Sequence, residues 1–210
     1  MKKDEVLETI LATKVIAVIR MSDPANLTRV VEAIEKGGIR AIEITMTTPS
    51  ALETIADMVK RKPAGTLIGA GTVLDAATAE SVIRAGAEFV VSPVTRFDMM
   101  DVCRKNNVFV APGALSPTEI LAAWEHGADV VKVFPATSLG PKYFRDLKGP
   151  LPQVRLMPTG GVSTENAGEF IRSGACCVAI GTALLDKKAV AAGDWAALTE
   201  KARALVESLR

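Results

Sequence analysis

The chain has 210 residues, of which 49% are hydrophobic and 23% are charged, proportions typical of a globular protein. This length allows one well-buried core, and we expect a single domain over residues 1–210. Lys and Arg total 25 against 24 Asp and Glu, so the net charge of +1 gives no basic footprint for nucleic acid or an anionic membrane. No apolar run approaches the roughly 18 residues of a membrane span. The sequence therefore predicts a cytoplasmic protein.

A repeating unit organises the chain after a short opening helix, which we expect over residues 3–12. Short runs rich in β-branched residues recur at regular intervals, and each is followed by a turn signal and an amphipathic helical pattern. The runs span residues 15–20, 41–46, 67–73, 89–93, 108–112, 130–135, 154–158 and 176–181. This order indicates about eight consecutive βα units.

The expected strands are nearly continuous apolar runs, as in a parallel sheet whose outer face is covered by helices. Right-handed βαβ connections make closure natural at about eight units. The sequence therefore predicts a (β/α)8 TIM barrel with a short N-terminal helix, and an open doubly wound sheet is the alternative. Two helix starts fit a capping box, Ser50 with Glu53 and Ser116 with Glu119.

Two charged residues interrupt expected strands. Glu43 lies within Ala41-Ile42-Glu43-Ile44-Thr45, and Lys132 lies within Val130-Val131-Lys132-Val133-Phe134. Burial of either charge without a partner costs several kcal/mol. Each could sit at a strand end with its charge in water, or the two could simply pair.

A chemical role explains both residues better. An apolar site lowers the pKa of a lysine, and the neutral amine of Lys132 could then attack a ketone carbonyl to form an imine. Glu43 could carry the protons that imine chemistry requires. Parallel strands of a closed barrel could direct both side chains toward one pocket near their carboxyl ends.

Glycines and hydroxyl groups follow the last two expected strands, in Thr159-Gly160-Gly161 and Gly181-Thr182. Barrel enzymes often bind phosphate at this position with exposed backbone N–H groups. The alternative is that the glycines only form tight turns. Gly69-Ala70-Gly71-Thr72 adds a hydroxyl group and backbone donors that could hold a carboxylate.

Taken together, these residues resemble the family of 2-keto-3-deoxy-6-phosphogluconate (KDPG) aldolases, which often also cleave 4-hydroxy-2-oxoglutarate. The matching strings cover nearly the whole chain. They are Glu43-Ile44-Thr45, Gly69-Ala70-Gly71-Thr72-Val73, Val91-Ser92-Pro93, Pro112-Gly113, Lys132-Val133-Phe134-Pro135-Ala136 and Pro158-Thr159-Gly160-Gly161-Val162. The resemblance implies a class I aldolase without metal or cofactor, usually a homotrimer. It would release pyruvate and glyceraldehyde 3-phosphate from KDPG, or pyruvate and glyoxylate from 4-hydroxy-2-oxoglutarate.

The resemblance also implies roles for individual residues. Lys132 would form the imine, and Glu43 would be the acid and base. Thr72 would hold the pyruvate carboxylate, while Pro93 and Phe134 would form walls of the pocket.

Further substrate-binding candidates come from the same motifs. Thr45 ends the string that contains the glutamate, and Thr159 would contact the hydroxyl groups of the substrate. Gly160, Gly161 and Gly181-Thr182 would face the phosphate.

One departure concerns the carboxylate clamp. Well-known members of the family carry an arginine two residues after the strand threonine, where this chain has Thr47. Arg20, at the end of the first expected strand, could reach the same mouth and donate to a carboxylate, so we expect it to replace that arginine. The alternative is a solvated arginine at a strand end.

Metal and histidine chemistry are disfavoured by the spacing of the relevant residues. The single histidine, His126, fits a helix C-terminus. Cys103 is remote from Cys176 and Cys177, which should point to opposite faces of a strand, and the three match neither a zinc spacing nor a disulfide framework.

Three rival functions stay open at the level of sequence. Another phosphosugar barrel, an isomerase or epimerase, shares the phosphate-end glycines without needing an imine. An aldolase for a stereoisomeric 2-keto-3-deoxy sugar acid would share every motif above. A non-catalytic barrel that serves as a binding module is the third.

Overall fold

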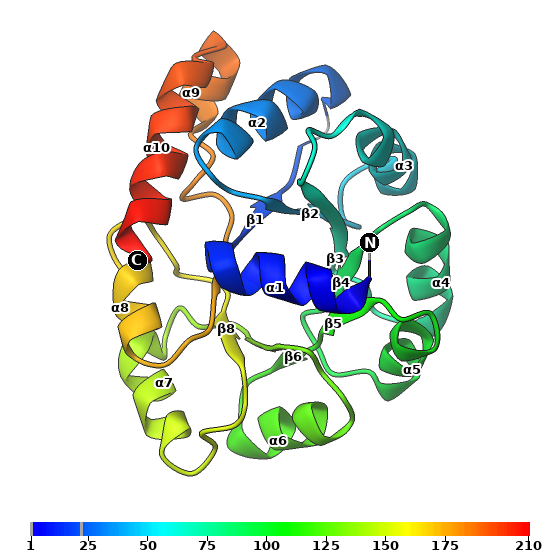
Figure 1. Ribbon diagram of the computed structural model, residues 1–210, viewed down its shortest axis with the longest axis vertical. Helices are drawn as coiled ribbons and strands as arrows, with labels where there is room; N and C mark the ends of the chain where they lie inside the picture. The colour runs from blue at the N-terminus through cyan, green and yellow to red at the C-terminus, as the bar shows by residue number, and fades with distance from the viewer. Residues whose placement is uncertain (1, 22) are drawn as a thin grey trace.

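The computed structural model describes residues 2–21 and 23–210, which alternate between strands and helices around a central barrel (Figure 1). The strands are β1 (Val15–Ile19), β2 (Ala41–Thr45), β3 (Leu67–Gly71), β4 (Phe89–Val91), β5 (Phe109–Ala111), β6 (Gly113–Ala114), β7 (Val131–Val133), β8 (Leu156–Pro158) and β9 (Val178–Ile180). The helices are α1 (Lys3–Thr13), α2 (Pro24–Lys36), α3 (Ala51–Arg61), α4 (Ala76–Arg84), α5 (Phe97–Lys105), α6 (Pro117–Glu125), α7 (Gly140–Lys148), α8 (Ala167–Arg172), α9 (Lys187–Ala192) and α10 (Trp195–Ser208).

The strands close into a ring of eight parallel units. Hydrogen bonding gives one sheet in the order β5-β4-β3-β2-β1-β9 and a second in the order β6-β7-β8. Strands β5 and β6 are two parts of one extended segment, interrupted at Pro112, which has no N–H to donate. A parallel bridge between Thr159 and Ala179 joins β8 to β9. The predicted TIM barrel is thereby confirmed, and the open sheet is excluded.

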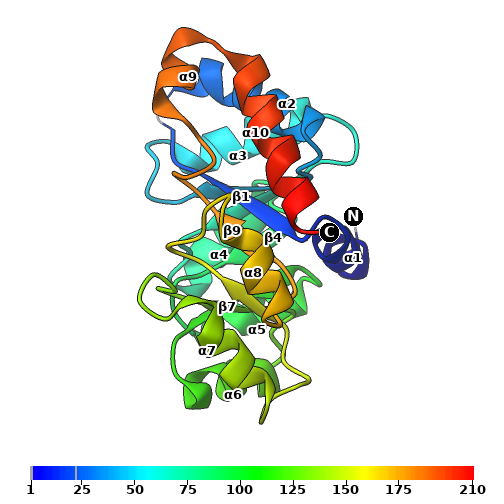
Figure 2. The same ribbon diagram turned by 90° about the vertical axis from the view of Figure 1, so that its left-hand side faces the viewer.

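Helix α1 covers the amino-terminal end of the barrel, where it lies across the strands in Figure 1 and on the right-hand side of the molecule in Figure 2. Val6 and Ile10 on this helix are buried in the same apolar cluster as Phe89 and Phe109, whose rings meet edge to face with centroids 6.3 Å apart. Its observed span agrees with the predicted residues 3–12. Because α1 closes this end, the carboxyl ends of the strands form the open mouth.

One predicted capping box is confirmed and the other is wrong. Ser116 Oγ accepts a hydrogen bond from the Glu119 backbone N–H, and Glu119 Oε2 accepts one from the Ser116 N–H. Ser50 instead has φ 52°, in the left-handed region, and its side chain makes no capping bond. A capping serine needs an extended backbone to turn its hydroxyl group toward the first helical turn, which explains the difference.

The outer helices are short. Within the part of the chain that the structure describes, none is long and apolar enough to cross a membrane.

Candidate active site

The predicted site residues gather at the carboxyl end of the barrel. Six strand ends supply them: Arg20 follows β1, Thr45 ends β2, Thr72 follows β3, Pro93 follows β4, Phe134 follows β7, and Thr159 follows β8. Gly181 follows β9 and completes this rim. Since all strands are parallel, residues far apart in the sequence face a single mouth.

Lys132 and Glu43 lie deeper, within strands β7 and β2. Lys132 is 5% exposed, and its Nζ atom lies 5.1 Å from the centroid of the Phe134 ring. Glu43 is 1% exposed, and its Oε2 atom has no hydrogen-bond partner among the described residues. A buried carboxyl oxygen without a partner is costly, which favours a chemical role for Glu43 over a structural one.

Burial shifts the pKa values of the two groups in opposite directions. It raises the pKa of the Glu43 carboxyl, and the positive charges of Lys132 and Arg20 only partly oppose this shift. It lowers the pKa of the Lys132 ammonium, which the negative charge of Glu43 opposes and the positive charge of Arg20 reinforces. Lys132 therefore loses its proton more easily than a solvated lysine does, and the neutral amine is the form that attacks a carbonyl carbon.

Gly71 makes room for Glu43, a role that the sequence analysis did not predict. A Cβ atom added at Gly71 would overlap the Oε1, Cδ and Cγ atoms of Glu43. Only glycine leaves this space, so the end of β3 fixes where the carboxyl group lies. The sequence carried one signal for this role. Gly71 lies two residues after Gly69, and Gly69 is the residue that pairs with Glu43 in the sheet.

The threonines at the mouth differ in their surroundings. Thr45 is fully buried, and its Oγ1 lies 3.1 Å from Thr47 Oγ1 and 3.3 Å from Thr48 Oγ1. Thr72 has φ 60°, a left-handed conformation that is unusual for a β-branched residue. Strain of this kind costs about 1–3 kcal/mol and is concentrated at functional sites, which fits a binding role for Thr72.

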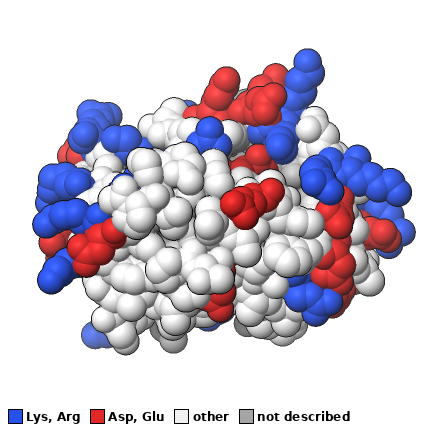
Figure 3. Space-filling view, turned by 90° about the horizontal axis from the view of Figure 1, so that it is seen from below, with Lys and Arg blue, Asp and Glu red and all other residues white. Residues whose placement is uncertain are grey.

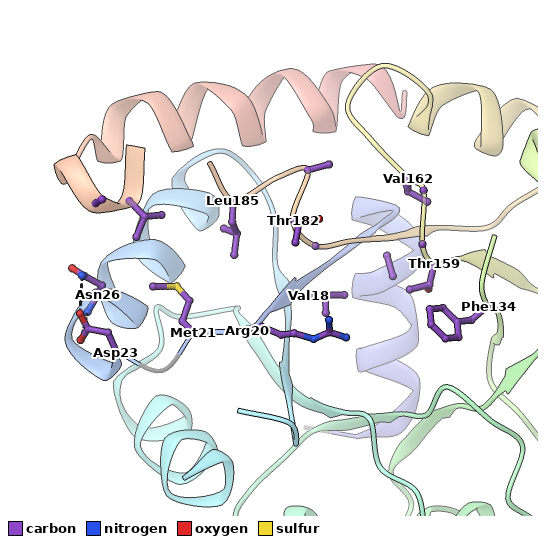
Figure 4. Close-up of a pocket in the computed structure, with 17 residues that line it drawn as sticks. Val18, Arg20, Met21, Asp23, Asn26, Phe134, Thr159, Val162, Thr182 and Leu185 are labelled. Carbon is purple, nitrogen blue, oxygen red and sulfur yellow. Dashed lines mark hydrogen bonds between the residues drawn. The ribbon is translucent and has the colours of Figure 1, made fainter. Parts of the chain in front are cut away.

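A pocket of about 600 Å³ opens at the rim between β1, β8 and β9 (Figure 4). Seven of the predicted site residues line it, namely Arg20, Phe134, Thr159, Gly160, Gly161, Gly181 and Thr182. Lys132, Glu43, Thr45, Thr72 and Pro93 are not among its lining residues. Phe134 connects the pocket with the predicted site residues outside it, because its ring lies beside the Lys132 amine and also lines the pocket.

The loop after β8 presents polar groups to this pocket. Gly160 and Gly161 have φ values of 86° and 73°, so the tight turn and the exposed backbone are properties of the same two residues. Thr159 Oγ1 is buried and has no hydrogen-bond partner among the described residues. An unsatisfied buried hydroxyl group is suited to a hydroxyl group of a ligand.

Arg20 extends toward the same region. Figure 4 shows its side chain pointing from the end of β1 toward Phe134. The positive charge of Arg20 contributes to lowering the pKa of both Glu43 and Lys132. Thr47, in contrast, is engaged with the hydroxyl group of Thr45.

Part of the pocket wall was not predicted. Val18 and Ala179 contribute from within strands, Val162 lies in the loop after β8, and the others come from the segments around α2 and α9. The additional lining residues are Val18, Met21, Asp23, Asn26, Val162, Ala179, Ala183, Leu185, Val190 and Ala191. Most are apolar, and in a sequence they cannot be told apart from core residues.

No group of three or more His, Cys, Asp or Glu side chains within the described residues could hold a metal ion. His126 caps the C-terminus of α6, as expected, and its Nε2 lies 3.0 Å from Asp101 Oδ1. The expected geometry of the adjacent cysteines is wrong. A bend at Cys176, before β9 begins, brings its Sγ to 3.7 Å from that of Cys177 instead of turning the two side chains apart.

A closed parallel barrel that buries a lysine within β7 and a glutamate within β2, below the open mouth, has the architecture expected of a lysine-dependent aldolase. The family model for KDPG and KHG aldolases matches residues 6–201. The chain belongs to this aldolase family.

Individual relatives agree with this assignment. A 2-dehydro-3-deoxy-phosphogluconate aldolase of Pseudomonas aeruginosa is 36% identical over 92% of this chain and 88% of its own length. The KHG/KDPG aldolase of Escherichia coli K12 is 31% identical over 97% of this chain and 96% of its own. The crystal structure of KDPG aldolase from Legionella pneumophila, with pyruvate captured at low pH as a covalent carbinolamine intermediate, has a TM-score of 0.87. It is 29% identical over 95% of this chain and 97% of its own.

Proposed function

We propose that this protein cleaves KDPG to pyruvate and glyceraldehyde 3-phosphate through an imine on Lys132, and that it also cleaves 4-hydroxy-2-oxoglutarate to pyruvate and glyoxylate. The observation that carries the proposal is the pair of buried ionisable groups, Lys132 and Glu43, whose pKa values are shifted toward the neutral forms. Membership of the aldolase family supports the choice of substrates.

The reaction follows from these two groups. The Lys132 amine attacks the C2 carbonyl of the substrate, and the carbinolamine loses water to give a protonated imine. Glu43 accepts the proton of the C4 hydroxyl group as the C3–C4 bond breaks, and the bonding electrons enter the imine to form an enamine. The aldehyde leaves, and Glu43 returns the proton to C3. Hydrolysis of the imine then releases pyruvate and restores the amine.

The rim residues hold the two ends of the substrate. Arg20 and Thr72 bind the carboxylate, and the buried hydroxyl group of Thr159 binds a substrate hydroxyl group. The backbone N–H groups around Gly160 and Gly181 receive the phosphate. Thr45 acts indirectly, because its hydroxyl group is bonded to Thr47 and Thr48.

Borohydride reduction in the presence of pyruvate tests the imine. Wild-type protein should gain the mass of reduced pyruvate on the peptide that contains Lys132, and Lys132→Met should neither trap pyruvate nor cleave KDPG. Lys60→Met is the matched control, because Lys60 is exposed on α3. Cleavage by folded Lys132→Met protein would disprove the assignment. Assays with KDPG and its stereoisomers in parallel would identify the preferred sugar acid.

We also propose that the protein assembles as a homotrimer. Figure 3 views the side of the barrel that carries α6 and shows charged side chains toward both sides of a mostly uncharged centre. Three large apolar side chains near α5 and α6, those of Val94, Phe97 and Leu115, are exposed by 40% or more. Light scattering after gel filtration should give the mass of three chains. The cytoplasmic location stays a prediction from the sequence, to be checked by cell fractionation.

A further inference from the structure

Two cysteines at the amino-terminal end of the barrel take no part in the proposed reaction. Cys177 is buried in the apolar cluster that α1 covers, and Cys176 is half-buried and packs against the same cluster. In an extended strand their side chains would point to opposite faces. The bend at Cys176 instead brings the two Sγ atoms to 3.7 Å from each other, and both thiols are free. The chain therefore carries two adjacent thiols, one partly accessible to solvent and one enclosed.

Backbone hydrogen bonds hold this bend on both sides. The Cys176 N–H donates to Leu156 O at 2.9 Å, which ties the bend to the start of β8. The Ala175 N–H donates to Phe170 O at 3.1 Å, which ties it to α8. The close approach of the two sulfur atoms is therefore set by the fold.

The surroundings make the two thiols chemically different. The hydrogen bond with Cys177 lowers the pKa of the Cys176 thiol, and burial only partly opposes this shift. The positive charges of Arg155 and Lys148 lower the same pKa further. The hydrogen bond with Cys176, burial and the negative charge of Cys176 raise the pKa of Cys177 well above its usual value. Cys176 is therefore the thiol that ionises more easily, and Cys177 stays protonated beside it.

Protein contacts fix both cations near Cys176. Lys148 Nζ donates to Val154 O at 2.9 Å, just before β8. Arg155 Nη1 donates to Asp129 O at 3.3 Å, and its guanidinium carbon lies 5.6 Å from the centroid of the Trp124 ring. These partners are backbone carbonyl oxygens and an aromatic ring, which leave the positive charges in place to stabilise a thiolate.

We propose that Cys176 and Cys177 form a reversible modification site for hydroperoxides, in which Cys176 is oxidised first and Cys177 then closes a disulfide. Redox-sensing cysteines are typically accessible thiols of low pKa beside a second, resolving cysteine. The proposal does not depend on the imine chemistry, because the thiols lie at the end of the barrel opposite the open mouth. Cys103 gives the contrast: burial raises its pKa to about 12, so it should stay inert.

The reaction needs only the hydroperoxide as oxidant. The Cys176 thiolate attacks one oxygen of the peroxide, the O–O bond breaks, and the leaving oxygen takes up the proton that Cys176 released. The sulfur is now a sulfenic acid, and the peroxide has been reduced to an alcohol or water. The Cys177 thiol loses its proton and attacks the Cys176 sulfur. The S–S bond forms, the S–O bond breaks, and the hydroxide leaves with that proton as water.

The geometry favours a bond that forms and is also readily reduced. A disulfide bond is about 2.05 Å long, so the sulfur atoms must approach by about 1.7 Å from their separation of 3.7 Å. Adjacent Cα atoms are about 3.8 Å apart, which is less than the roughly 4.4–6.8 Å usual for a disulfide, and strained disulfides are labile. Closure also protects Cys176 from further oxidation to sulfinic acid, which thiol reductants do not reverse.

Peptide mapping of the reduced full-length protein after treatment with hydrogen peroxide tests the pair. Trypsin releases both cysteines in one peptide, residues 173–187, and Cys103 in another, residues 97–104. The first peptide should lose two hydrogen atoms and resist alkylation until dithiothreitol is added, whereas the Cys103 peptide should stay fully alkylated. Two alkylated thiols in the first peptide after peroxide treatment, or equal oxidation of Cys103, would overturn the proposal.

Three alanine variants assign the order of the steps. Cys177→Ala should stop at the sulfenic acid of Cys176, which dimedone captures, and excess peroxide should convert that acid to the sulfinic acid. Cys176→Ala should leave Cys177 alkylatable, because a buried protonated thiol reacts poorly. Cys103→Ala is the matched control and should form the disulfide as wild type does.

Oxidation of Cys177 in Cys176→Ala at the rate seen in wild type would refute the assigned order. Circular dichroism of each variant shows whether it folds. If Cys177→Ala does not fold, the peptides of wild type and Cys176→Ala decide, since these two already separate the proposed pair from unselective oxidation.

Discussion

Substitution of Gly71 by alanine tests how the sheet positions the proposed acid and base. The added methyl group would overlap three atoms of Glu43, and the carboxyl group must retreat by roughly 1 Å or more. A displacement of this size can lower the rate about 10²-fold, which lies within the 10² to 10⁴ that a positioned proton donor contributes. Overpacking should also cost about 1–3 kcal/mol of stability.

The assay compares kcat for KDPG cleavage with pyruvate trapping and with thermal unfolding. Trapping should persist in Gly71→Ala, because Lys132 lies on a different strand. Gly69→Ala is the packing control: its Cβ would overlap the Phe89 ring, so it should lower stability with a much smaller loss of kcat. Gly149→Ala is the neutral control, because its Cβ would meet only Asp146 O at 3.5 Å. A wild-type kcat in Gly71→Ala would refute the role of Gly71.

Three further predictions concern the site and the fold. Glu43→Gln should lower kcat about 10²- to 10⁴-fold. Because burial raises the pKa of Glu43, ionisation of this carboxyl group in the folded protein costs stability. The Tm of wild type should therefore fall relative to that of Glu43→Gln as pH rises above the usual carboxyl pKa. An equal Tm difference at all pH values would contradict this. Arg20→Ala should lower kcat/KM about tenfold to a few hundredfold, because the variant loses a charge-assisted hydrogen bond to the substrate. Wild-type kinetics in this variant would show that Arg20 is a solvated arginine at a strand end. Ser116→Ala should cost about 1 kcal/mol in urea unfolding, whereas Ser50→Ala should cost less.

The barrel could be predicted because its signals are local and repeated. Each strand is an apolar run ended by a turn, and the parallel order follows from the alternation with helices. Glu43 and Lys132 were identifiable for a related reason. A charge inside an apolar strand is energetically unfavourable, and the structure places both side chains in the interior with exposures of 1% and 5%.

Features that depend on backbone conformation or on distant segments could not be predicted. Ser50 has the composition of a cap but a left-handed backbone, and Cys176 lies in a bend instead of a strand. Met21 and Leu185 face the same pocket only because the segments that follow β1 and β9 are neighbours in the closed ring. Apolar residues carry no chemical signature, so only the three-dimensional arrangement distinguishes a pocket wall from the core.

The number of positive charges at the mouth relates the missing family arginine to the choice of substrate. KDPG carries a carboxylate at one end and a phosphate at the other, whereas among the described lining residues the pocket has one guanidinium, that of Arg20. Thr47 cannot supply a second positive charge, and its hydroxyl group is bonded to Thr45. Arg20 points toward Phe134, whose ring lies beside the Lys132 amine, and there it can serve the carboxylate that every 2-keto acid substrate shares. The phosphate end then depends on neutral backbone N–H groups, which bind an anion less strongly than a charged donor does. Loss of the phosphate should therefore cost this enzyme less affinity than loss of the carboxylate.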